Sequence, residues 1–277
     1  MFRDRPIGPD AHRYLLAGAG EPVTRPFHLR WLLPTLLGDS LRRWWIVWLG
    51  SWIVLAVATG FWAYGSGLAG WQLVAAIAFL VALPGILGPE VSIPVSVDLP
   101  ATALTIAGVA LIATGETINI IIGVGILTVG AMIRETVPMV AALLAWHPIA
   151  LVALLAPVVC QIIRTPAATS GVPEWDAITA HPIRAGIAYH AGRWRDARLM
   201  VLPWGVCLAG LYAPTPRIVA IVLVAYLQLL VATDTVRIVQ HVAGPALSLA
   251  AAATIPVEWL PLAIIAHTFW FIIPERI

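Results

Sequence analysis

The stretch Trp44–Tyr64 reads WWIVWLGSWIVLAVATGFWAY and carries no charged side chain. About 20 apolar residues in an α-helix cross the ~30 Å hydrocarbon core of a bilayer. Tryptophan collects at the boundary between lipid and water, and Trp44, Trp45 and Trp48 open the stretch. The sequence therefore predicts a membrane-spanning helix here. Because the arginine-rich residues 1–43 precede it, we expect a retained helix and not a cleaved signal peptide.

The rest of the chain continues this pattern. Of its 277 residues, 60% are hydrophobic and only 11% are charged, whereas a soluble domain carries about 25% charged residues. The apolar residues come in long blocks without the alternation of barrel strands, which favours helices as the spanning elements. We predict an all-α polytopic integral membrane protein with about eight transmembrane helices, and about seven to nine fit the block lengths. The apolar blocks are 44–64, 69–87, 101–133, 138–163, 199–213, 218–233, 236–255 and 257–273.

Two arginine-rich segments, 1–43 and 164–198, set the orientation. Arginine collects in cytoplasmic segments near membrane spans, so both are predicted to be cytoplasmic and an even number of crossings separates them. An even number of crossings between the two segments favours a single crossing for 101–133. The blocks after residue 198 then return the chain to the cytoplasm, so both termini are predicted to be cytoplasmic. The chain then divides into a cytoplasmic tail (1–43), a first transmembrane group (44–163), a cytoplasmic amphipathic loop (164–198) and a second transmembrane group (199–277).

Two blocks contain breaks, and whether 101–133 and 218–255 each cross once or twice is open at this point. Gly115-Glu116-Thr117 interrupts the first block, and residues 233–237 interrupt the second. In the block 138–163, the missing amide of Pro148 favours a kink.

Residues 231–244 read VATDTVRIVQHVAG and place charge inside an apolar run. In one continuous helix, Asp234, Arg237 and His241 share a face, and charges inside a bilayer usually line a bundle interior or an aqueous path. The alternative is a turn, in which Thr233 or Asp234 caps the following helix and Arg237 reaches phosphates or water. We expect Asp234 and Arg237 to pair in either case.

Glu116 and Asn119 pose the same choice. They share a face if the helix of 101–133 continues, whereas Gly115 ends a helix if it does not. The even number of crossings favours continuation, so Glu116 is predicted to be a buried acid, with helix capping or headgroup contact as the alternative. The candidate pathway residues are Glu116, Asn119, Asp234, Arg237 and His241.

Residues 181–198 read HPIRAGIAYHAGRWRDAR. Arginines interleaved with Tyr189 and Trp194 suit a helix on the membrane surface that meets anionic headgroups. Alternatively, His190, Arg193 and Asp196 recur at helical spacing and grip a phosphate while supplying a base. The candidate headgroup-binding residues are His181, Arg184, His190, Arg193, Arg195 and Arg198.

Three classes of function fit these patterns. The first is a transporter or permease-like protein for a small ion or solute, the second a non-catalytic scaffold or envelope-modifying membrane protein, and the third an enzyme acting on a lipid-linked substrate at the cytoplasmic face. Cys160 and Cys207 form no metal or disulfide pattern, and no zinc, serine-hydrolase or phosphate-loop motif is present. We therefore expect no metal and no cofactor, and we lean away from an enzyme.

The predicted partners follow from the same composition. A formal net charge of +2 gives no reason to expect nucleic-acid binding. We expect contact with the bilayer and its anionic headgroups, and we leave a homo-oligomer or a membrane-protein partner open. The predicted location is the cell membrane, as a multi-pass protein of the bacterial plasma membrane or of a virus-encoded set.

Overall fold

The structure is a computed structural model, and it describes residues 9–23, 27–87, 95–164, 180–196, 200–230 and 236–270. Within these ranges every regular element is a helix, which confirms the all-α prediction. In chain order the described helices are α1 (Pro9–Gly18), η1 (Phe27–Leu29), α2 (Leu32–Leu37), α3 (Leu41–Gly65), α4 (Trp71–Val81), α6 (Asp98–Ile112), α7 (Thr117–Ile133), α8 (Val137–Ala145), η2 (Pro148–Leu154), α9 (Leu155–Ile163), α11 (Pro182–His190), η3 (Leu202–Leu211), α13 (Pro216–Leu227), η4 (Gln228–Leu230), α14 (Val236–Thr254), η5 (Val257–Trp259) and α15 (Leu260–Trp270).

The long helix α3 contains the predicted first apolar stretch. Among the described helices it is long and apolar enough to cross a bilayer on its own. A second candidate is a bent pair, Val236–Thr254 with Val257–Phe269, whose two parts meet at 114°. The other apolar helices are shorter, so the helix lengths alone leave the predicted number of crossings unsettled.

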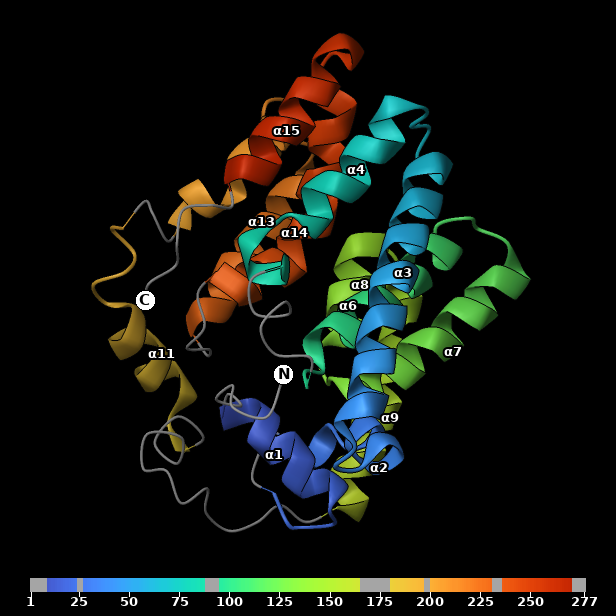
Figure 1. Ribbon diagram of the computed structural model, residues 1–277, viewed down its shortest axis with the longest axis vertical. Coiled ribbons are helices and arrows are strands. Elements are labelled where there is room, and N and C mark those ends of the chain that lie inside the picture. The colour runs from blue at the N-terminus through green and yellow to red at the C-terminus, as the bar shows by residue number, and fades with distance from the viewer. Residues whose placement is uncertain are drawn as a thin grey trace.

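In residues 9–23 and 27–43 the arginine-rich N-terminal segment forms short helices before α3 begins. We call α1, η1, α2 and their described connections the N-terminal cap. It lies at one end of the molecule, next to the beginning of α3 and the end of α9 (Figure 1). Tyr14 of α1 is only 3% exposed, and its ring lies 5.4 Å from that of Phe27 and 6.3 Å from that of Trp44. Burial of these aromatic rings holds the cap against the bundle.

The block 101–133 forms a hairpin, so the predicted single crossing is wrong. α6 ends at Ile112, the chain turns through Gly115 with a φ of +75°, and α7 returns alongside α6. A left-handed φ is cheap only for glycine. The two helices pack closely because Gly108 faces Gly123, where an added Cβ would lie 2.9 Å from the Gly108 carbonyl oxygen.

The block 138–163 also reverses direction, where a kinked single helix was predicted. α8 ends at Ala145, and Trp146 directly after it adopts a left-handed φ of +54°. The His147 side chain accepts a hydrogen bond from the Ile149 amide at 3.2 Å. α9 then ends beside the cap, where Gln161 is hydrogen bonded to His28 at 3.1 Å. α8 begins beside the cap as well, so both ends of the block lie on the same side.

The C-terminal helices form a second group, which α4 joins. α14 packs against η3, α13 and α4, while α15 packs against α4 and η3 (Figure 1). α13 and α14 are separate helices, and residues 231–235 between them lie outside the described part of the chain. The end of α13 and the beginning of α14 both contact the start of η3, through Tyr226 with Trp204 and Gln240 with Pro203. These two helices therefore run antiparallel, as the turn alternative predicts.

Candidate functional site

A buried carboxylate at the beginning of α6 lies between two arginines. Asp98 accepts a hydrogen bond from Arg134, which directly follows α7, and its other oxygen lies 3.2 Å from Nη1 of Arg237 in the first turn of α14. The Asp98 side chain is 7% exposed. A carboxylate in the first turn of a helix is also stabilised by the helix dipole. The hairpin of α6 and α7 explains the first pairing, because it brings the start of one helix beside the end of the other.

We call this end of the bundle the polar end, defined by Asp98, Arg134, Glu135 and Arg237. A close backbone contact brings α14 there: a Cβ on Gly85 would lie 2.7 Å from the Arg237 Cα, so only glycine fits. Gln240, 1% exposed, accepts a hydrogen bond from the Gly85 amide and donates one to the Pro203 carbonyl at 2.8 Å. One buried amide thus joins three chain segments.

The N-terminal cap is fastened to the polar end by ion pairs. Arg30 donates two hydrogen bonds to Glu135, Nε to Oε2 at 2.9 Å and Nη2 to Oε1 at 2.7 Å, and a third to the Tyr14 hydroxyl at 3.2 Å. Asp10 of α1 lies 3.9 Å from Nη2 of Arg237. Two-point pairing of a guanidinium with a carboxylate fixes both position and orientation.

Burial and the charge of Arg30 determine the protonation states of Glu135 and Tyr14 at the contact between the cap and the polar end. Burial raises the pKa of Glu135, but the adjacent positive charge of Arg30 and its hydrogen bonds outweigh this and lower the pKa to about 2. Burial raises the pKa of Tyr14 to about 12, against the opposing charge of Arg30. At neutral pH, Glu135 is therefore charged and the Tyr14 hydroxyl is protonated.

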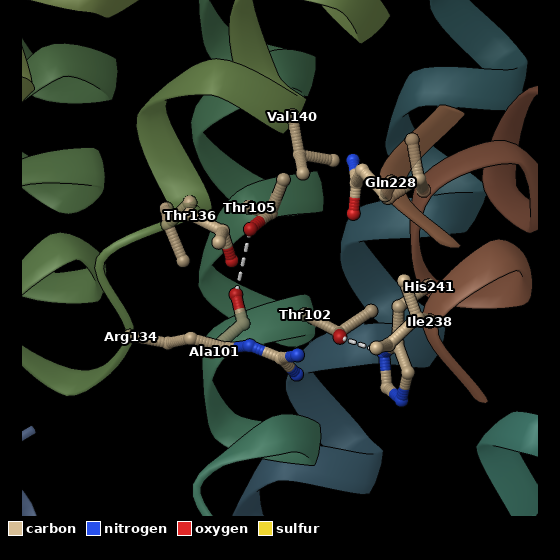
Figure 2. Close-up of a pocket in the computed structure, with 11 residues that line it drawn as sticks. Ala101, Thr102, Thr105, Arg134, Thr136, Val140, Gln228, Ile238 and His241 are labelled. Atoms are coloured by element: carbon tan, nitrogen blue, oxygen red, sulfur yellow. Dashed lines mark hydrogen bonds between the residues drawn. The ribbon is translucent and has the colours of Figure 1, made fainter. Parts of the chain in front are cut away.

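A small cavity of about 30 Å³ lies next to Asp98 and its arginines. About two water molecules fit in such a volume. Figure 2 shows Thr105, Thr136 and Gln228 around one part of the cavity and Arg134, Thr102 and His241 around the other. The remaining lining residues are apolar: Ala101, Val137, Val140, Ile238 and Val242. The lining combines α6, α8, α14 and η4, so the cavity lies between the two helix groups.

Some polar atoms at the cavity are already bonded. The Thr102 hydroxyl is hydrogen bonded to Nδ1 of His241, and the Thr105 hydroxyl donates to the Ala101 carbonyl at 2.8 Å (Figure 2). His241 is 7% exposed, and its Nε2 has no hydrogen-bond partner among the described residues. The same holds for Nε of Arg134. Buried polar atoms are usually hydrogen bonded, so these two atoms indicate a place where water or a ligand binds.

A second polar cluster, inside the C-terminal group, contains a thiol and an imidazole. Nδ1 of His267 accepts a hydrogen bond from the Val206 amide at 3.3 Å, so Nε2 carries the proton and donates it to the Phe79 carbonyl at 3.0 Å. Cys207 lies 3.9 Å from the same Nε2. Because that nitrogen is a donor to a carbonyl, it cannot take a proton from the thiol. The cluster joins α4, η3 and α15 and is not a nucleophile with its base.

The candidate pathway residues separate in the structure. Arg237 and His241 lie at the polar end, next to the cavity or its ion pairs. Asp234 lies outside the described residues, so its pairing with Arg237 stays a prediction. Glu116 is exposed in the turn between α6 and α7, and Asn119 is half-buried in the first turn of α7, where its amide donates to Glu116 at 2.9 Å. The prediction that Glu116 is a buried acid is wrong, because the helix ends before it.

The candidate headgroup-binding residues lie on and after α11. His181, Arg184 and Arg195 are exposed, Arg193 is half-buried over the Tyr189 ring at 3.9 Å, and His190 is buried. Arg198 lies outside the described residues. α11 ends at His190 and a turn follows, so His190, Arg193 and Asp196 do not share a helical face as the enzymatic alternative requires.

Four of the residues that make this site were missed by the sequence analysis: Asp98, Arg134, Glu135 and Arg30. Asp98, Arg134 and Glu135 lie next to apolar blocks, and Arg30 lies in the arginine-rich segment 1–43, and charged residues are expected at both places in a membrane protein. Asp98 in a first helical turn next to Pro100 is a signal for a helix start, but not for burial. Their partners are far apart in the sequence, so only the tertiary structure identifies the network.

No group of three or more His, Cys, Asp and Glu residues that could hold a metal ion occurs in the described parts of the chain. Comparison with protein-family models, with curated proteins and with solved structures finds no match to this chain.

Proposed function

We propose that this chain is a multi-pass membrane protein that carries a small ion or solute through its helical bundle, with the polar end on the cytoplasmic side. The observation that carries the proposal is the cavity beside Arg134 and His241. It is a small polar space between two groups of apolar helices, bordered by an arginine. Ionisable groups kept inside a membrane bundle usually border a substrate or ion path.

The membrane location is supported by apolar side chains on the outer faces of the helices. On α3, Ile46, Ile53 and Tyr64 are 61%, 66% and 69% exposed, and they follow the helix from one end toward the other. Similar exposed rows at helical spacing occur on α9 (Leu155, Val158, Ile162), α13 (Val219, Leu223, Leu227) and α15 (Leu262, Ile265, Phe269). Water would disfavour so many exposed apolar faces, whereas lipid would not.

The shorter helices are compatible with a bilayer when taken as hairpins. α7 has 17 residues, which gives a length of about 26 Å, near the lower end of the range for spanning helices. A bilayer adapts to short helices by thinning locally. With α6–α7 and α8–α9 as hairpins, an even number of crossings still separates the cap from α11, so both arginine-rich segments keep their cytoplasmic place.

α11 supports the cytoplasmic membrane surface as a partner. It carries exposed Ile183 and Ile187 beside exposed Arg184, and Gly186 packs directly on the Leu230 carbonyl. Apolar side chains next to an arginine on one short helix suit the boundary between acyl chains and anionic headgroups.

A flux measurement with a cavity-filling variant tests the proposal. Purified protein is reconstituted in liposomes, and ion, proton and small-solute flux is followed with entrapped indicator dyes and by light scattering. Val140 lines the cavity and is 8% exposed, so Val140→Phe should fill the cavity and reduce flux at least about tenfold. The neighbouring Met139, 48% exposed, provides the control Met139→Phe, which should conduct as the unchanged protein does.

Melting temperatures of both variants in detergent separate blocked flux from unfolding. If the liposomes show no flux above protein-free liposomes for any solute, or if Val140→Phe conducts normally while folded, the transport proposal is wrong.

A further inference from the structure

We infer that the cavity beside Arg134 is a binding site for a small monovalent anion. This inference rests on the proposed function only in placing the site on a solute path. The lining of the site includes three side chains that can donate hydrogen bonds, those of Thr136, Gln228 and Arg134.

The charge around the cavity favours an anion over a cation. Arg134 is the charged residue in the described lining, and no carboxylate belongs to that lining. The nearby carboxylates face other groups, because Asp98 pairs with Arg134 and Arg237, and Glu135 pairs with Arg30. A cation in the cavity would meet the guanidinium without a carboxylate to coordinate it, which is unfavourable at short range and low dielectric constant.

The hydrogen-bonding groups point to the same ligand. Nε of Arg134 is buried and has no hydrogen-bond partner within the described part of the chain. The Thr136 side chain makes no hydrogen bond that caps α8, and the Gln228 side chain lines the same cavity. Thr102 and Thr105, in contrast, are already bonded to His241 and Ala101. The guanidinium N–H can only donate, and the hydroxyl and the amide can each donate as well as accept. Hydrogen bonds from such donors to an anion are stronger than those between neutral groups.

The size of the cavity limits the ligand. A volume of about 30 Å³ admits roughly two water molecules and excludes organic solutes of metabolite size. Asp98 shares one negative charge between Arg134 and Arg237, so these three side chains together carry one excess positive charge, which matches a single negative charge on the ligand. The class of ligand is therefore a small monovalent anion such as fluoride, chloride or formate, and sulfate or gluconate are excluded by charge or by size.

A titration of the purified protein in detergent tests this assignment. Sodium fluoride, chloride and formate replace sodium gluconate at constant ionic strength, and the melting temperature is followed by tryptophan fluorescence. At least one of these anions should raise the melting temperature along a saturable curve, because a ligand that binds the folded state stabilises it. Sodium sulfate at the same ionic strength should give no saturable rise, only the gradual non-saturating rise of a salt that is excluded from the protein surface.

Variants that remove donors without removing charge identify the site. Thr136→Val and Gln228→Leu should each weaken the apparent affinity several-fold, and the double variant more than about tenfold, because each loses a hydrogen bond to a charged ligand. Matched controls make the same substitutions at residues that do not line the cavity: Gln72→Leu near the start of α4 and Thr254→Val at the end of α14. These controls should bind as the unchanged protein does.

The outcomes separate this inference from the proposed function. The inference is wrong, and the cavity holds water, if no small anion raises the melting temperature along a saturable curve. It is also wrong if the donor variants and their controls bind the anion with equal affinity. If an anion binds saturably and the donor variants weaken that binding, but the liposomes show no flux, the anion site is supported and the transport proposal is wrong. If the liposomes show flux of a cation or a neutral solute and Thr136→Val reduces that flux, the anion assignment is wrong but the cavity still lies on a solute path.

Discussion

Arg237, in the first turn of α14, places Nη1 3.2 Å from the carboxylate of Asp98 in the first turn of α6. This ion pair joins two groups of helices at the polar end, since α6 packs against α3 and α7, and α14 belongs to the C-terminal group. Arg134 pairs with the same carboxylate, so one buried acid holds the ends of three helices together. The stability of the polar end should therefore depend on Asp98.

Removing the charge of Asp98 should destabilise the protein strongly. In Asp98→Asn the carboxylate shared by Arg134 and Arg237 is lost, and breaking a buried ion pair from one side costs about 3–5 kcal/mol. We expect a clearly lower melting temperature in detergent and a lower yield. Asp39→Asn is the matched control, because Asp39 is exposed and the same change should cost under about 0.5 kcal/mol. Equal melting of the two variants would show that the Asp98 network does not stabilise the fold.

The pair Arg30–Glu135 predicts a pH dependence of stability. The pKa of Glu135 falls from 4.5 to about 2 on folding, so the unfolded chain takes up its proton first as the pH decreases. The stabilisation from Glu135 is fully present above pH 4.5 and is lost as the pH falls toward about 2. It amounts to about 3 kcal/mol at most, from about 1.4 kcal/mol for each unit of pKa.

Comparison with Glu135→Gln isolates this contribution. The difference in unfolding free energy between the unchanged protein and Glu135→Gln should be constant from pH 7 to about pH 5 and shrink between about pH 4.5 and 2. Urea unfolding in a non-ionic detergent at a series of pH values gives this difference. A difference that stays the same down to pH 2 would mean that Glu135 is not held charged by Arg30.

The contact of Gly108 with Gly123 predicts that the α6–α7 hairpin depends on small residues. In Gly123→Leu the new side chain meets the backbone of α6, and overpacking of this kind costs about 1–3 kcal/mol or more. Gly125, on the same helix, is exposed and has nothing within 4 Å of an added Cβ. Gly125→Leu should therefore be neutral or slightly stabilising, because leucine favours a helix over glycine. The melting temperatures of the two variants test this packing. If Gly123→Leu melts no lower than Gly125→Leu, Gly123 does not pack closely against α6.

Much of the helical arrangement is readable from the sequence because it is local. The tryptophan-rich start and apolar length of α3 predict its position, and α14 begins at Val236, the first residue of the predicted block 236–255. The turns between the helices were harder to predict than the helices themselves. Gly115 fits either an interruption within a helix or the end of one, and the packing of Gly108 on Gly123, which favours the hairpin, involves residues on two different helices.

The site was less predictable than the helices for a similar reason. Arg237 and His241 were found because a charge and an imidazole inside an apolar block are unusual. Asp98 and Arg134 border their blocks, where charge is ordinary, and only the reversal at Gly115 brings them together. The reversal at Trp146 was also missed, because a non-glycine residue with a positive φ has no dependable sequence signal.

Labelling of single cysteines with a membrane-impermeant maleimide tests the arrangement in the membrane most directly. The native Cys160 and Cys207 are 7% and 0% exposed and should give little background. Glu116→Cys, in the exposed turn of the α6–α7 hairpin, should react in intact cells, whereas Arg184→Cys, on exposed α11, should react only after the membrane is permeabilised. Reaction of both cysteines from the same side of the membrane would contradict the proposed multi-pass arrangement with the polar end in the cytoplasm.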